Sequence, residues 1–311
     1  MKESPSVYVI TLNWNGKELM DDCLSSLLAM NYSNFKVVMI DNGSQDDSVS
    51  YVKNKFPEVE TLQNGANLGY SGGFNIGLDY AFTKKEAKYV LVINNDIKID
   101  KSALSALVTV GETDEMIGFV TGKVYYFDRP DTLQTVGKKE DPIRWNGGHI
   151  GGREKDTGQY DAVCERAFAD DIFTLVRREL YLKTDGYDTT FFLQCEEYDW
   201  QARAKNLGYK IMYTPHAKLW HKESMTLGKT SPLKAYYDAR NPMLVILRHK
   251  SPDFFRRYFW LHLRNDVVRS SLKVLIKNLE FEKSYNIWTG FFSGVWWGIR
   301  NKKFTLRHFI P

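Results

Sequence analysis

The N-terminal third of the chain alternates between short, mostly apolar runs and segments with helical spacing. Apolar residues recur at helical spacing in 17–30, and helices are also expected behind the N-cap residue Ser44 and up to about Lys84. Apolar runs of this length are typical of strands buried on both faces. The alternation therefore predicts a mostly parallel sheet with helices on both faces. The runs lie at 7–13, 35–41, 59–62 and 89–94.

Polar residues follow each of these predicted strands. They lie at 11–15, at Asp41, at 67–73 and at Asp96. In sheets of this kind, ligands bind at the carboxyl ends of the strands. The four polar sites are therefore expected to converge on one binding site.

Two of these sites suggest which ligand is bound. Residues 67–77 are dense in glycine, which lets backbone N–H groups approach a ligand closely, and Asp96 ends the Asn94-Asn95-Asp96 segment. An aspartate at a strand end can hold a divalent cation against phosphate oxygens. Together they predict a nucleoside-diphosphate site. Taken alone, the glycines also fit a close helix–sheet contact, and the segment lacks the spacing of a dinucleotide fingerprint.

The rest of the chain is organised differently. Strand-like segments at 118–127 and 168–176 flank a Gly/Asp-rich stretch, 128–160, that is expected to form loops or a hairpin. From residue 232 onward the pattern is helical. We expect a catalytic domain over 1–247, with halves 1–115 and 116–247, and a helical C-terminal region over 248–311.

The C-terminal region also differs in charge. It carries 13 Lys/Arg and 4 Asp/Glu, whereas the first 247 residues carry 29 and 34, so the net charge of +4 hides an asymmetry. Aromatic residues accompany the cations over 254–303, a pattern that suits a helix lying on anionic lipid. Packing against the catalytic body or a second subunit is the alternative. No nucleic-acid-binding motif accompanies the charge.

Cysteine content and hydropathy bear on location. The cysteines are odd in number and lack metal-ligand spacing, which favours a reducing compartment. We expect no signal peptide and no transmembrane helix, because no stretch of 18 residues is free of charge. The expected location is cytoplasmic, at the inner face of the membrane. The cysteines are Cys23, Cys164 and Cys195.

Five motifs in this order resemble family 2 glycosyltransferases with the GT-A fold, in particular the rhamnosyltransferase-type branch. The resemblance covers roughly residues 6–250. It implies a nucleotide-sugar donor, inversion at the anomeric carbon and a divalent metal, Mg²⁺ or Mn²⁺. The motifs are Val-Ile-Thr-Leu-Asn-Trp-Asn-Gly (9–16), Ile-Asp-Asn-Gly-Ser-Gln-Asp (40–46), Asn-Leu-Gly-Tyr-Ser-Gly-Gly-Phe-Asn (67–75), Ile-Asn-Asn-Asp (93–96) and Phe-Phe-Leu-Gln-Cys-Glu-Glu-Tyr-Asp-Trp (191–200).

Carried over residue by residue, the resemblance implies three groups of site residues. The metal would be held by Asp96 and His221, and Arg240 would face the diphosphate or an acceptor phosphate. The catalytic base would come from the cluster Glu196, Glu197 and Asp199, with Glu197 the best match in position. The nucleotide sugar would be bound by Thr11, Asn13, Asn15, Asp41, Asn67, Gly69, Gly72, Gly73, Asn75, Asn94 and Asn95.

Each of these residues also has a plainer interpretation. The acidic cluster fits an ordinary first helical turn, where the positive helix end favours ionised carboxylates. His221 fits a structural hydrogen-bond donor, and Arg240 fits a helix surface. Two departures from the family pattern stand out: Asn94 replaces the first acid of the metal motif, and Ala169-Asp170-Asp171 replaces a small-residue segment.

The expected reaction moves one sugar from a nucleoside diphosphate to an acceptor hydroxyl. A cation stabilises the leaving diphosphate and a carboxylate receives the hydroxyl proton. The branch implies dTDP-L-rhamnose as donor, with a UDP-hexose or UDP-N-acetylhexosamine as the rival. The acceptor is expected to be a lipid-linked surface glycan.

Two other classes of protein are alternatives to a glycosyltransferase. A sugar-1-phosphate nucleotidyltransferase would carry its Gly-rich loop, with a basic residue, after the first strand, where this chain has Asn13-Trp14-Asn15-Gly16. A non-catalytic scaffold on a decayed transferase is kept open by Asn94, whereas Asp96 and Glu197 argue against it. The oligomeric state stays open.

Overall fold

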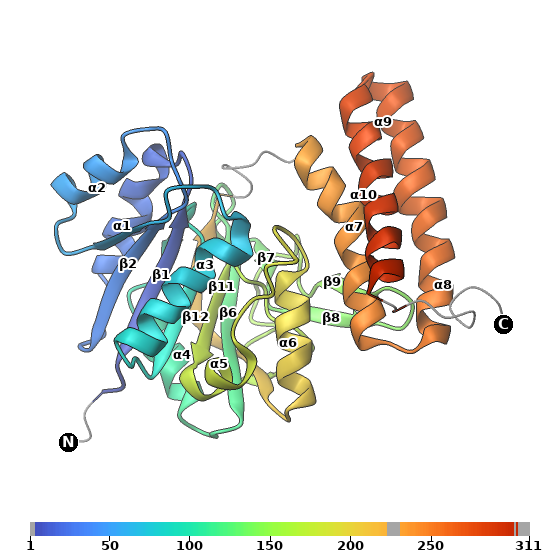
Figure 1. The fold of residues 1–311 in the computed structure, drawn as a ribbon. Helices are drawn as coiled ribbons and strands as arrows, with labels where there is room; N and C mark the ends of the chain where they lie inside the picture. Colours follow the sequence, from blue (N-terminus) through green and yellow to red (C-terminus); the bar gives the residue numbers. More distant parts are fainter. Residues whose placement is uncertain (1–3, 223–230, 302, 304–311) are drawn as a thin grey trace.

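A computed structural model of the chain describes residues 4–222, 231–301 and 303. Within that part, ten strands form a curled central sheet with helices on both faces, and four C-terminal helices stand beside it (Figure 1). The strands are β1 (Val7–Asn13), β2 (Phe35–Asp41), β3 (Glu60–Gln63), β4 (Tyr89–Ile93), β5 (Ile97–Ile99), β6 (Ile117–Tyr126), β7 (Leu133–Thr135), β8 (Lys138–Asp141), β9 (Trp145–His149), β10 (Cys164–Glu165), β11 (Phe173–Arg177) and β12 (Lys210–His221).

The helices follow the expected alternation in the first half and dominate the C-terminal region. Short 3₁₀ or π segments occur at Lys17–Leu19, Tyr80–Lys84 and Leu263–Arg269. The α-helices are α1 (Met20–Leu28), α2 (Ser48–Lys55), α3 (Gly69–Asp79), α4 (Ala103–Gly111), α5 (Arg178–Thr184), α6 (Glu196–Asn206), α7 (Pro232–His249), α8 (Pro252–His262), α9 (Ser270–Asn278) and α10 (Phe281–Arg300).

The strand order of the main sheet is β10-β12-β6-β11-β4-β1-β2-β3. Strands β1 to β4 pair in parallel, whereas β11 is antiparallel to both β4 and β6. The predicted fold class, a mostly parallel sheet flanked by helices, is confirmed. The parallel register sets Asn13 beside Asp41 and Asp41 beside Gln63, so the carboxyl ends of three strands share one edge.

The glycine-dense segment is mostly helix. Helix α3 begins at Gly69, so Gly72 and Gly73 lie inside it. A Cβ at Gly73 would lie 2.6 Å from Leu12 Cδ1, and one at Gly77 would lie 2.6 Å from Ile40 Cδ1. These glycines therefore let α3 pack closely against β1 and β2, which is the helix–sheet contact left open by the sequence.

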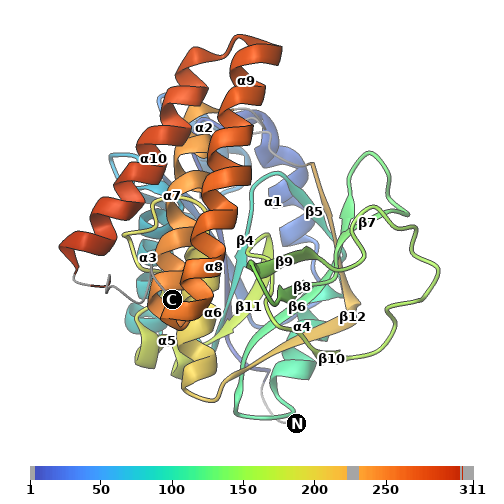
Figure 2. The ribbon, with the colours of Figure 1, turned by 90° about the vertical axis from the view of Figure 1, so that its right-hand side faces the viewer.

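The Gly/Asp-rich stretch after β6 contains the hairpin β8–β9 as well as loops, in line with the sequence. In Figure 2 the loops around β7 and β10 extend on one side of the molecule and the C-terminal helices lie on the other. The loops are anchored to β6 by Lys123, whose buried Nζ lies 2.6 Å from carboxylates of both Asp156 and Asp161. Such a fully paired buried cation fixes an otherwise irregular segment.

The C-terminal helices form a unit with their own apolar core. Helix α10 packs tightly on α7, because a Cβ at Gly290 would overlap the backbone of Tyr236 and one at Gly294 would lie 3.2 Å from the Arg240 carbonyl oxygen. The boundary expected after residue 247 falls inside α7, so this unit includes α7. Residues 302 and 304–311 of the expected C-terminal region lie outside the described residues.

None of the described helices has both the length and the apolar character needed to cross a lipid bilayer.

Candidate active site

A cavity of about 500 Å³ opens at the carboxyl ends of the parallel strands. One side is formed by residues that follow β1, β2, β3 and β4, and the other by the hairpin β8–β9, the start of α6 and the start of α7. The lining includes Leu12, Trp14, Asn42, Asn67, Gly69, Tyr70, Asn94, Asn95, Asp96, Gln134, Lys138, His149, Asp170, Asp171, Phe192, Glu196, Glu197, His221 and Lys234. Residues of both expected halves, 1–115 and 116–247, therefore line this cavity.

Asp96 and His221 face each other at one end of the cavity. Asp96 follows β4 and His221 ends β12, and Asp96 Oδ1 lies 3.0 Å from His221 Nε2. His221 Nδ1 lies 2.9 Å from the side-chain oxygen of Gln134, so the Nδ1–H donates to that oxygen. This hydrogen bond fixes the tautomer and leaves the Nε2 lone pair directed at the Asp96 side.

This pair of donors fits a divalent cation. Two ligands bonded at about 2.1 Å and at a right angle are separated by about 3.0 Å, as Asp96 Oδ1 and His221 Nε2 are. Both side chains are only about 6% exposed, so two protein ligands meet where diphosphate oxygens can complete the coordination. The donor set is one carboxylate and one imidazole, because Asn94 supplies no charge.

Three carboxylates lie close together in another part of the cavity lining. One oxygen from each of Asp171, Glu196 and Glu197 lies within 4.8 Å of the others. Burial, and then the negative charges of Glu197 and Asp170, raise the pKa of Asp171 well above its ordinary value. Burial, Glu197 and Asp171 likewise raise the pKa of Glu196. These shifts favour the protonated forms of Asp171 and Glu196, whereas a general base must be ionised.

Glu197 differs from its two neighbours because a cation lies beside it. Lys138 Nζ lies 2.8 Å from Glu197 Oε1 and 3.4 Å from Asp170 Oδ2. Burial alone would lower the pKa of Lys138, but the charges of Asp170 and Glu197 hold it well above its ordinary value. The side chain of Glu197 is 12% exposed and opens to the cavity.

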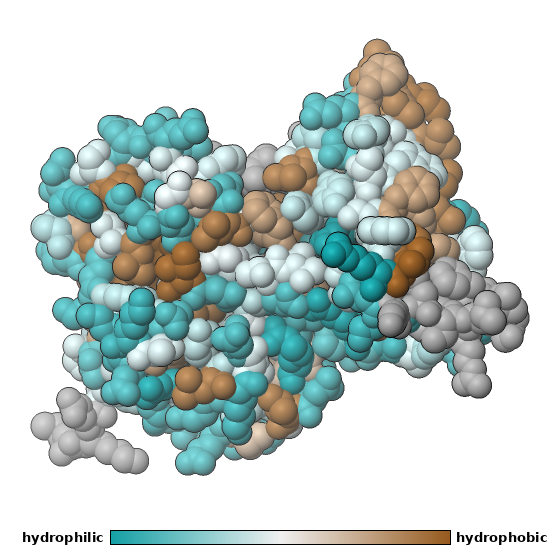
Figure 3. Space-filling model, in the orientation of Figure 1, coloured by the Kyte–Doolittle hydropathy of each residue, from teal (hydrophilic) through white to brown (hydrophobic). Residues whose placement is uncertain are grey.

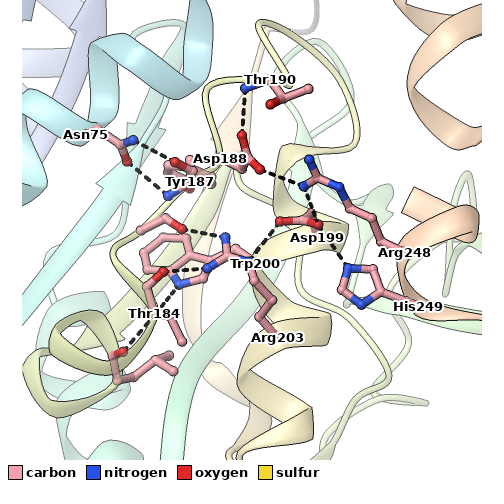
Figure 4. A network of polar contacts seen from close by, with 12 residues as sticks. Asn75, Thr184, Tyr187, Asp188, Thr190, Asp199, Trp200, Arg203, Arg248 and His249 are labelled. Carbon is pink, nitrogen blue, oxygen red and sulfur yellow. Dashed lines mark hydrogen bonds and ion pairs between the residues drawn. The ribbon is translucent and has the colours of Figure 1, made fainter. Parts of the chain in front are cut away.

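Asp199, expected as a member of the catalytic cluster, points away from the cavity. Figure 4 shows it within a buried network in which Arg248, His249 and Arg203 contact its carboxylate at 2.9–3.0 Å. Two residues along a helix turn the side chain through about 200°, so Asp199 and Glu197 face opposite sides of α6. Asp199 joins α6 to α7 and does not touch the cavity.

Arg240 also lies outside the cavity lining. Its guanidinium donates to the carbonyl oxygen of Thr190 and to Asn241 Oδ1, at 3.0 and 2.7 Å. Asn241 Nδ2 donates to the carbonyl oxygens of Leu193 and Gln194, at 2.7 and 2.8 Å. Helix α7 therefore holds the loop that leads into α6, rather than presenting Arg240 to a phosphate.

The expected residues of β1 and β2 lie beneath the cavity or beside it. The buried side chains of Thr11 and Asn13 project to the opposite face of β1 from Leu12, because strand residues alternate. Asn13 Nδ2 donates to Asp41 Oδ1 at 3.3 Å and to Ser48 Oγ at 2.8 Å. Asn15 is exposed, and its Oδ1 accepts from the backbone N–H of Gln45.

Other expected residues divide between the lining and the scaffold. Asn67, Gly69, Asn94 and Asn95 line the cavity. Gly72 and Gly73 lie within α3 and do not. Asn75 does not line it either: its side chain donates to the Tyr187 carbonyl oxygen and accepts from the Tyr187 N–H, at 2.7 and 3.0 Å.

Several lining residues were not singled out in the sequence. Lys138, Gln134 and His149 come from the stretch expected to form loops, which carries no recognisable motif. The sequence did offer a way to identify Asn42, because this residue follows Asp41 in the Ile-Asp-Asn-Gly motif. Its side chain accepts from the Leu68 N–H and donates to the Gly69 carbonyl oxygen, at 3.0 Å each, so it shapes the start of α3.

Comparison with known proteins identifies the family. The family described as glycosyl transferase family 2 matches residues 6–183, and the chain belongs to this family. A poly-beta-1,6-N-acetyl-D-glucosamine synthase of Staphylococcus aureus (strain COL) is 24% identical over 220 residues, or 69% of this chain and 49% of that protein. The chain thus spans about half the length of this relative.

A second curated relative matches over more of its own length. The N-acetylglucosaminyl-diphospho-decaprenol L-rhamnosyltransferase of Mycobacterium tuberculosis (strain ATCC 25618 / H37Rv) is 23% identical over 246 residues, or 71% of this chain and 77% of that protein.

Solved structures of glycosyltransferases share the fold. The mannosyltransferase PcManGT from Pyrobaculum calidifontis, in complex with GDP-Man and Mn²⁺, has a TM-score of 0.59 at 14% identity, covering 95% of this chain and 88% of that one. TarS residues 1–349 from S. aureus, in complex with UDP-GlcNAc, has a TM-score of 0.58 at 16% identity, covering 93% and 81%. The fold expected from the sequence resemblance is thereby confirmed.

Proposed function

We propose that this chain is an inverting glycosyltransferase that moves a sugar from a nucleoside-diphosphate donor to an acceptor hydroxyl. One observation carries the proposal. A single cavity is lined both by the Asp96–His221 pair and by Glu197, which lies beside Lys138. The first pair suits the leaving diphosphate, and the second suits deprotonation of the attacking hydroxyl.

Glu197 is the proposed general base. It opens to the cavity at the first turn of α6, where the positive end of the helix favours an ionised carboxylate. Burial and the neighbouring carboxylates raise the pKa values of Glu196 and Asp171, which makes these two residues less suited to act as the base. A carboxylate that receives the acceptor proton contributes roughly 10²–10⁴-fold to the rate.

Inversion follows if the base acts on the side of the sugar opposite the diphosphate. In the proposed arrangement Asp96 and His221 hold the diphosphate through a cation, and Glu197 acts on the opposite side of the sugar. The acceptor oxygen therefore attacks the anomeric carbon from the face opposite the departing phosphate oxygen. No covalent enzyme intermediate is required, and the hydroxyl proton moves to a carboxylate oxygen of Glu197.

Asp96 and His221 are the proposed metal ligands. The bound cation would offset the charge that develops on the leaving diphosphate. Imidazole is a softer ligand than the oxygens that Mg²⁺ prefers, so the mixed pair favours Mn²⁺ over Mg²⁺. The acidic lining of the cavity also opposes binding of a diphosphate without a cation.

The proposed donor is dTDP-L-rhamnose. Support comes from the rhamnosyltransferase-type motifs and from the M. tuberculosis relative, whose name also specifies a lipid-linked diphosphate acceptor. A UDP-N-acetylhexosamine or UDP-hexose is the second candidate, favoured by the S. aureus synthase and by the fold of TarS with UDP-GlcNAc. We propose a lipid-linked glycan as the acceptor.

A lipid-linked acceptor agrees with the surface of the C-terminal helices. Figure 3 shows hydrophobic side chains gathered over the tip of these helices. Basic residues flank them on α9, and this combination suits adsorption to anionic lipid. We propose that this face contacts the inner surface of the membrane. Exposed apolar residues on α9, at its turn to α10 and in the first turns of α10 are Leu272, Ile276, Leu279, Phe281 and Tyr285, and others along α8 and α10 are Trp260, Phe292, Trp296 and Ile299; the exposed cations are Lys273 and Lys277 on α9 and Arg269 just before it.

The test of membrane contact is co-sedimentation with vesicles of phosphatidylglycerol or phosphatidylcholine. We expect binding to the anionic vesicles, weakened by high salt and lost in the double variant Ile276→Glu/Leu279→Glu. Absence of binding, together with a stable dimer that this double variant dissociates, would assign the face to a second copy instead.

The test of enzymatic function is release of nucleoside diphosphate from a panel of sugar nucleotides with Mn²⁺ or Mg²⁺. We expect metal-dependent hydrolysis of one donor, strongest for dTDP-L-rhamnose with Mn²⁺, and its loss in Asp96→Ala. If no donor is hydrolysed, nucleotide binding is measured next. Absence of both hydrolysis and binding would contradict the proposal and favour a non-catalytic protein on this fold.

A further inference from the structure

Lys138 occupies an unusual position for a lysine at an active site. It lies on β8, its side chain is 9% exposed, and its Nζ is 2.8 Å from the carboxylate proposed as the catalytic base. The side chain also lies over the ring of Tyr198, with Nζ 4.7 Å from the ring centre. Burying a lysine costs free energy unless its charge is paired. The ion pair with Glu197 therefore offsets the cost of burying Lys138.

The backbone around Lys138 is fixed as well. Its N–H donates to the carbonyl oxygen of Phe168 at 2.8 Å, and the Phe168 N–H donates to the Lys138 carbonyl oxygen at 3.3 Å. The ring of Phe168 packs edge-on against Trp145 of β9 and against Tyr198 of α6. The lysine is therefore aimed at α6 by the sheet, the hairpin and an aromatic cluster together.

The charge around Glu197 explains why a fixed cation matters there. Asp170, Asp171 and Glu196 surround it, so four carboxylates share one end of the cavity. Without a counter-charge, each would favour the protonated form of the others. Among the described residues, Lys138 is the only cation in an ion pair with Glu197.

The other groups that face this end of the cavity do not replace Lys138. His149 of β9 lies 3.3 Å from Asp170 rather than at Glu197. Lys234 of α7 lines the cavity but pairs with Asp238 on its own helix. Tyr70 of α3 donates to the Asp171 carbonyl oxygen, and Tyr187 lies against the Asp171 side chain. Cys195 precedes α6 and is half-buried, and its thiol brings no positive charge.

We propose that Lys138 is a positioning residue whose positive charge stabilises the Glu197 carboxylate and fixes its orientation, so that Glu197 can accept the acceptor proton. This inference rests on the proposed function, because it takes Glu197 as the base. Lys138 itself transfers no proton. Its charge offsets the negative charges of Glu197 and Asp170, and its Nζ holds Glu197 Oε1 in place.

The inference is tested by the pH profile of kcat/KM for donor hydrolysis in Lys138→Met, Lys138→Arg and the wild type. The acidic limb of this profile reports the essential base of the free enzyme. Removing the adjacent positive charge is expected to move the acidic limb of Lys138→Met to higher pH by about 1–3 pH units. On the acidic limb, activity then falls by about tenfold for each pH unit of the shift, and it recovers at alkaline pH. Lys138→Arg retains the positive charge, so its acidic limb is expected at the same pH as that of the wild type.

Controls separate this effect from a general loss of structure. Lys139→Met changes the adjacent, exposed lysine of the same strand and is expected to leave the profile unchanged. If Lys138→Met does not fold, Lys138→Gln is used for the same comparison, because the glutamine amide is polar but uncharged. Nucleotide binding by each variant, measured by calorimetry, reports whether the donor site is intact.

The outcomes distinguish this inference from the function on which it rests. An unshifted acidic limb in the uncharged variants, or a loss that is equal at every pH, would overturn the role of Lys138. Wild-type hydrolysis by Glu197→Gln would instead overturn the base assignment and, with it, the proposed function. A shifted limb in Lys138→Met together with an inactive Glu197→Gln supports both.

Discussion

Asp199 of α6 and Arg248 of α7 form a buried ion pair, with Asp199 Oδ1 3.0 Å from Arg248 Nη1. The same guanidinium nitrogen lies 2.7 Å from Asp188 Oδ2, in the loop that precedes α6 (Figure 4). One arginine of the C-terminal helices thus holds both the helix that carries Glu197 and the loop leading into it. The helical unit is therefore part of the site's scaffold and not an independent appendage.

This ion pair predicts a pH-dependent contribution to stability. Burial alone would raise the pKa of Asp199, but the hydrogen bond from His249 and the charges of Arg203 and Arg248 lower it well below its ordinary value. The stabilisation is therefore present above the unfolded-state pKa of about 3.9 and is lost as the pH falls through the folded-state value. We expect Asp199→Asn to lose roughly 3–5 kcal/mol of unfolding free energy at pH 7.

Denaturant unfolding of wild type and Asp199→Asn between pH 7 and pH 3 measures this effect. The difference between the two proteins should shrink as the pH falls below about 4. Asp253→Asn, which removes an exposed carboxylate at the start of α8, is the control and should change stability little. A difference that stays constant with pH would contradict the assigned role.

A second prediction concerns the loop held by Asn241. Gln194 and Cys195 both have φ near +70°, a conformation that costs free energy for non-glycine residues and that the Asn241 amide helps to maintain. Asn241→Ala should lower kcat by roughly up to 10²-fold, because a small displacement of Glu197 is enough, while the KM for donor changes little. Steady-state kinetics measures kcat and the KM for donor separately. Asn286→Ala, on α10, is the matched control. An unchanged kcat in Asn241→Ala would contradict the role of Asn241 in holding the loop before α6.

A third prediction concerns Gln134, which orients the proposed metal ligand His221. Gln134→Ala removes the acceptor of the Nδ1–H and should weaken Mn²⁺ affinity by roughly 10–100-fold. Titration of Mn²⁺ with nucleoside diphosphate present, followed by electron paramagnetic resonance, measures the affinity. Gln159→Ala changes an exposed loop glutamine and should have no effect. Equal affinities for Gln134→Ala and wild type would place the metal elsewhere.

A fourth prediction uses two glycines with the same backbone conformation. Gly65 and Gly69 both have φ of +72°, but a Cβ at Gly65 meets open space, whereas one at Gly69 would overlap the carbonyl oxygen and ring of Phe192. Both alanine variants carry a conformational cost of roughly 1–2 kcal/mol. Gly69→Ala should lose a further 1–3 kcal/mol or so and also lose activity, because Phe192 precedes α6. Thermal unfolding and hydrolysis rates compare the two, and equal losses would contradict this reasoning.

The sequence predicted the strands and helices better than the directions in which individual side chains point. The apolar runs gave the parallel strands, because buried strands need little beyond hydrophobicity and turns. The face on which a residue lies depends on exact register, since neighbouring strand residues alternate. Thr11 and Asn13 were therefore expected in the cavity, whereas Leu12 and Trp14 line it.

The same limit applies on helices and across long distances in the chain. Glu197 and Asp199 share one motif, but about 200° of helical rotation sends Asp199 into the interface with α7. Lys138 reaches Glu197 across 59 residues of chain, through a hairpin that has no repeating pattern. Only the folded packing of β8, Phe168 and α6 shows that the lysine belongs to the site.

The measurement that tests the central claim most directly compares Glu197→Gln with wild type in two assays on the same preparations. One is metal-dependent hydrolysis or transfer from the active donor, and the other is nucleoside-diphosphate binding by calorimetry. Glutamine keeps the shape of the side chain but cannot accept the hydroxyl proton. We predict that turnover falls by roughly 10²–10⁴-fold while the nucleotide Kd stays within about twofold. Wild-type turnover in Glu197→Gln would contradict the account.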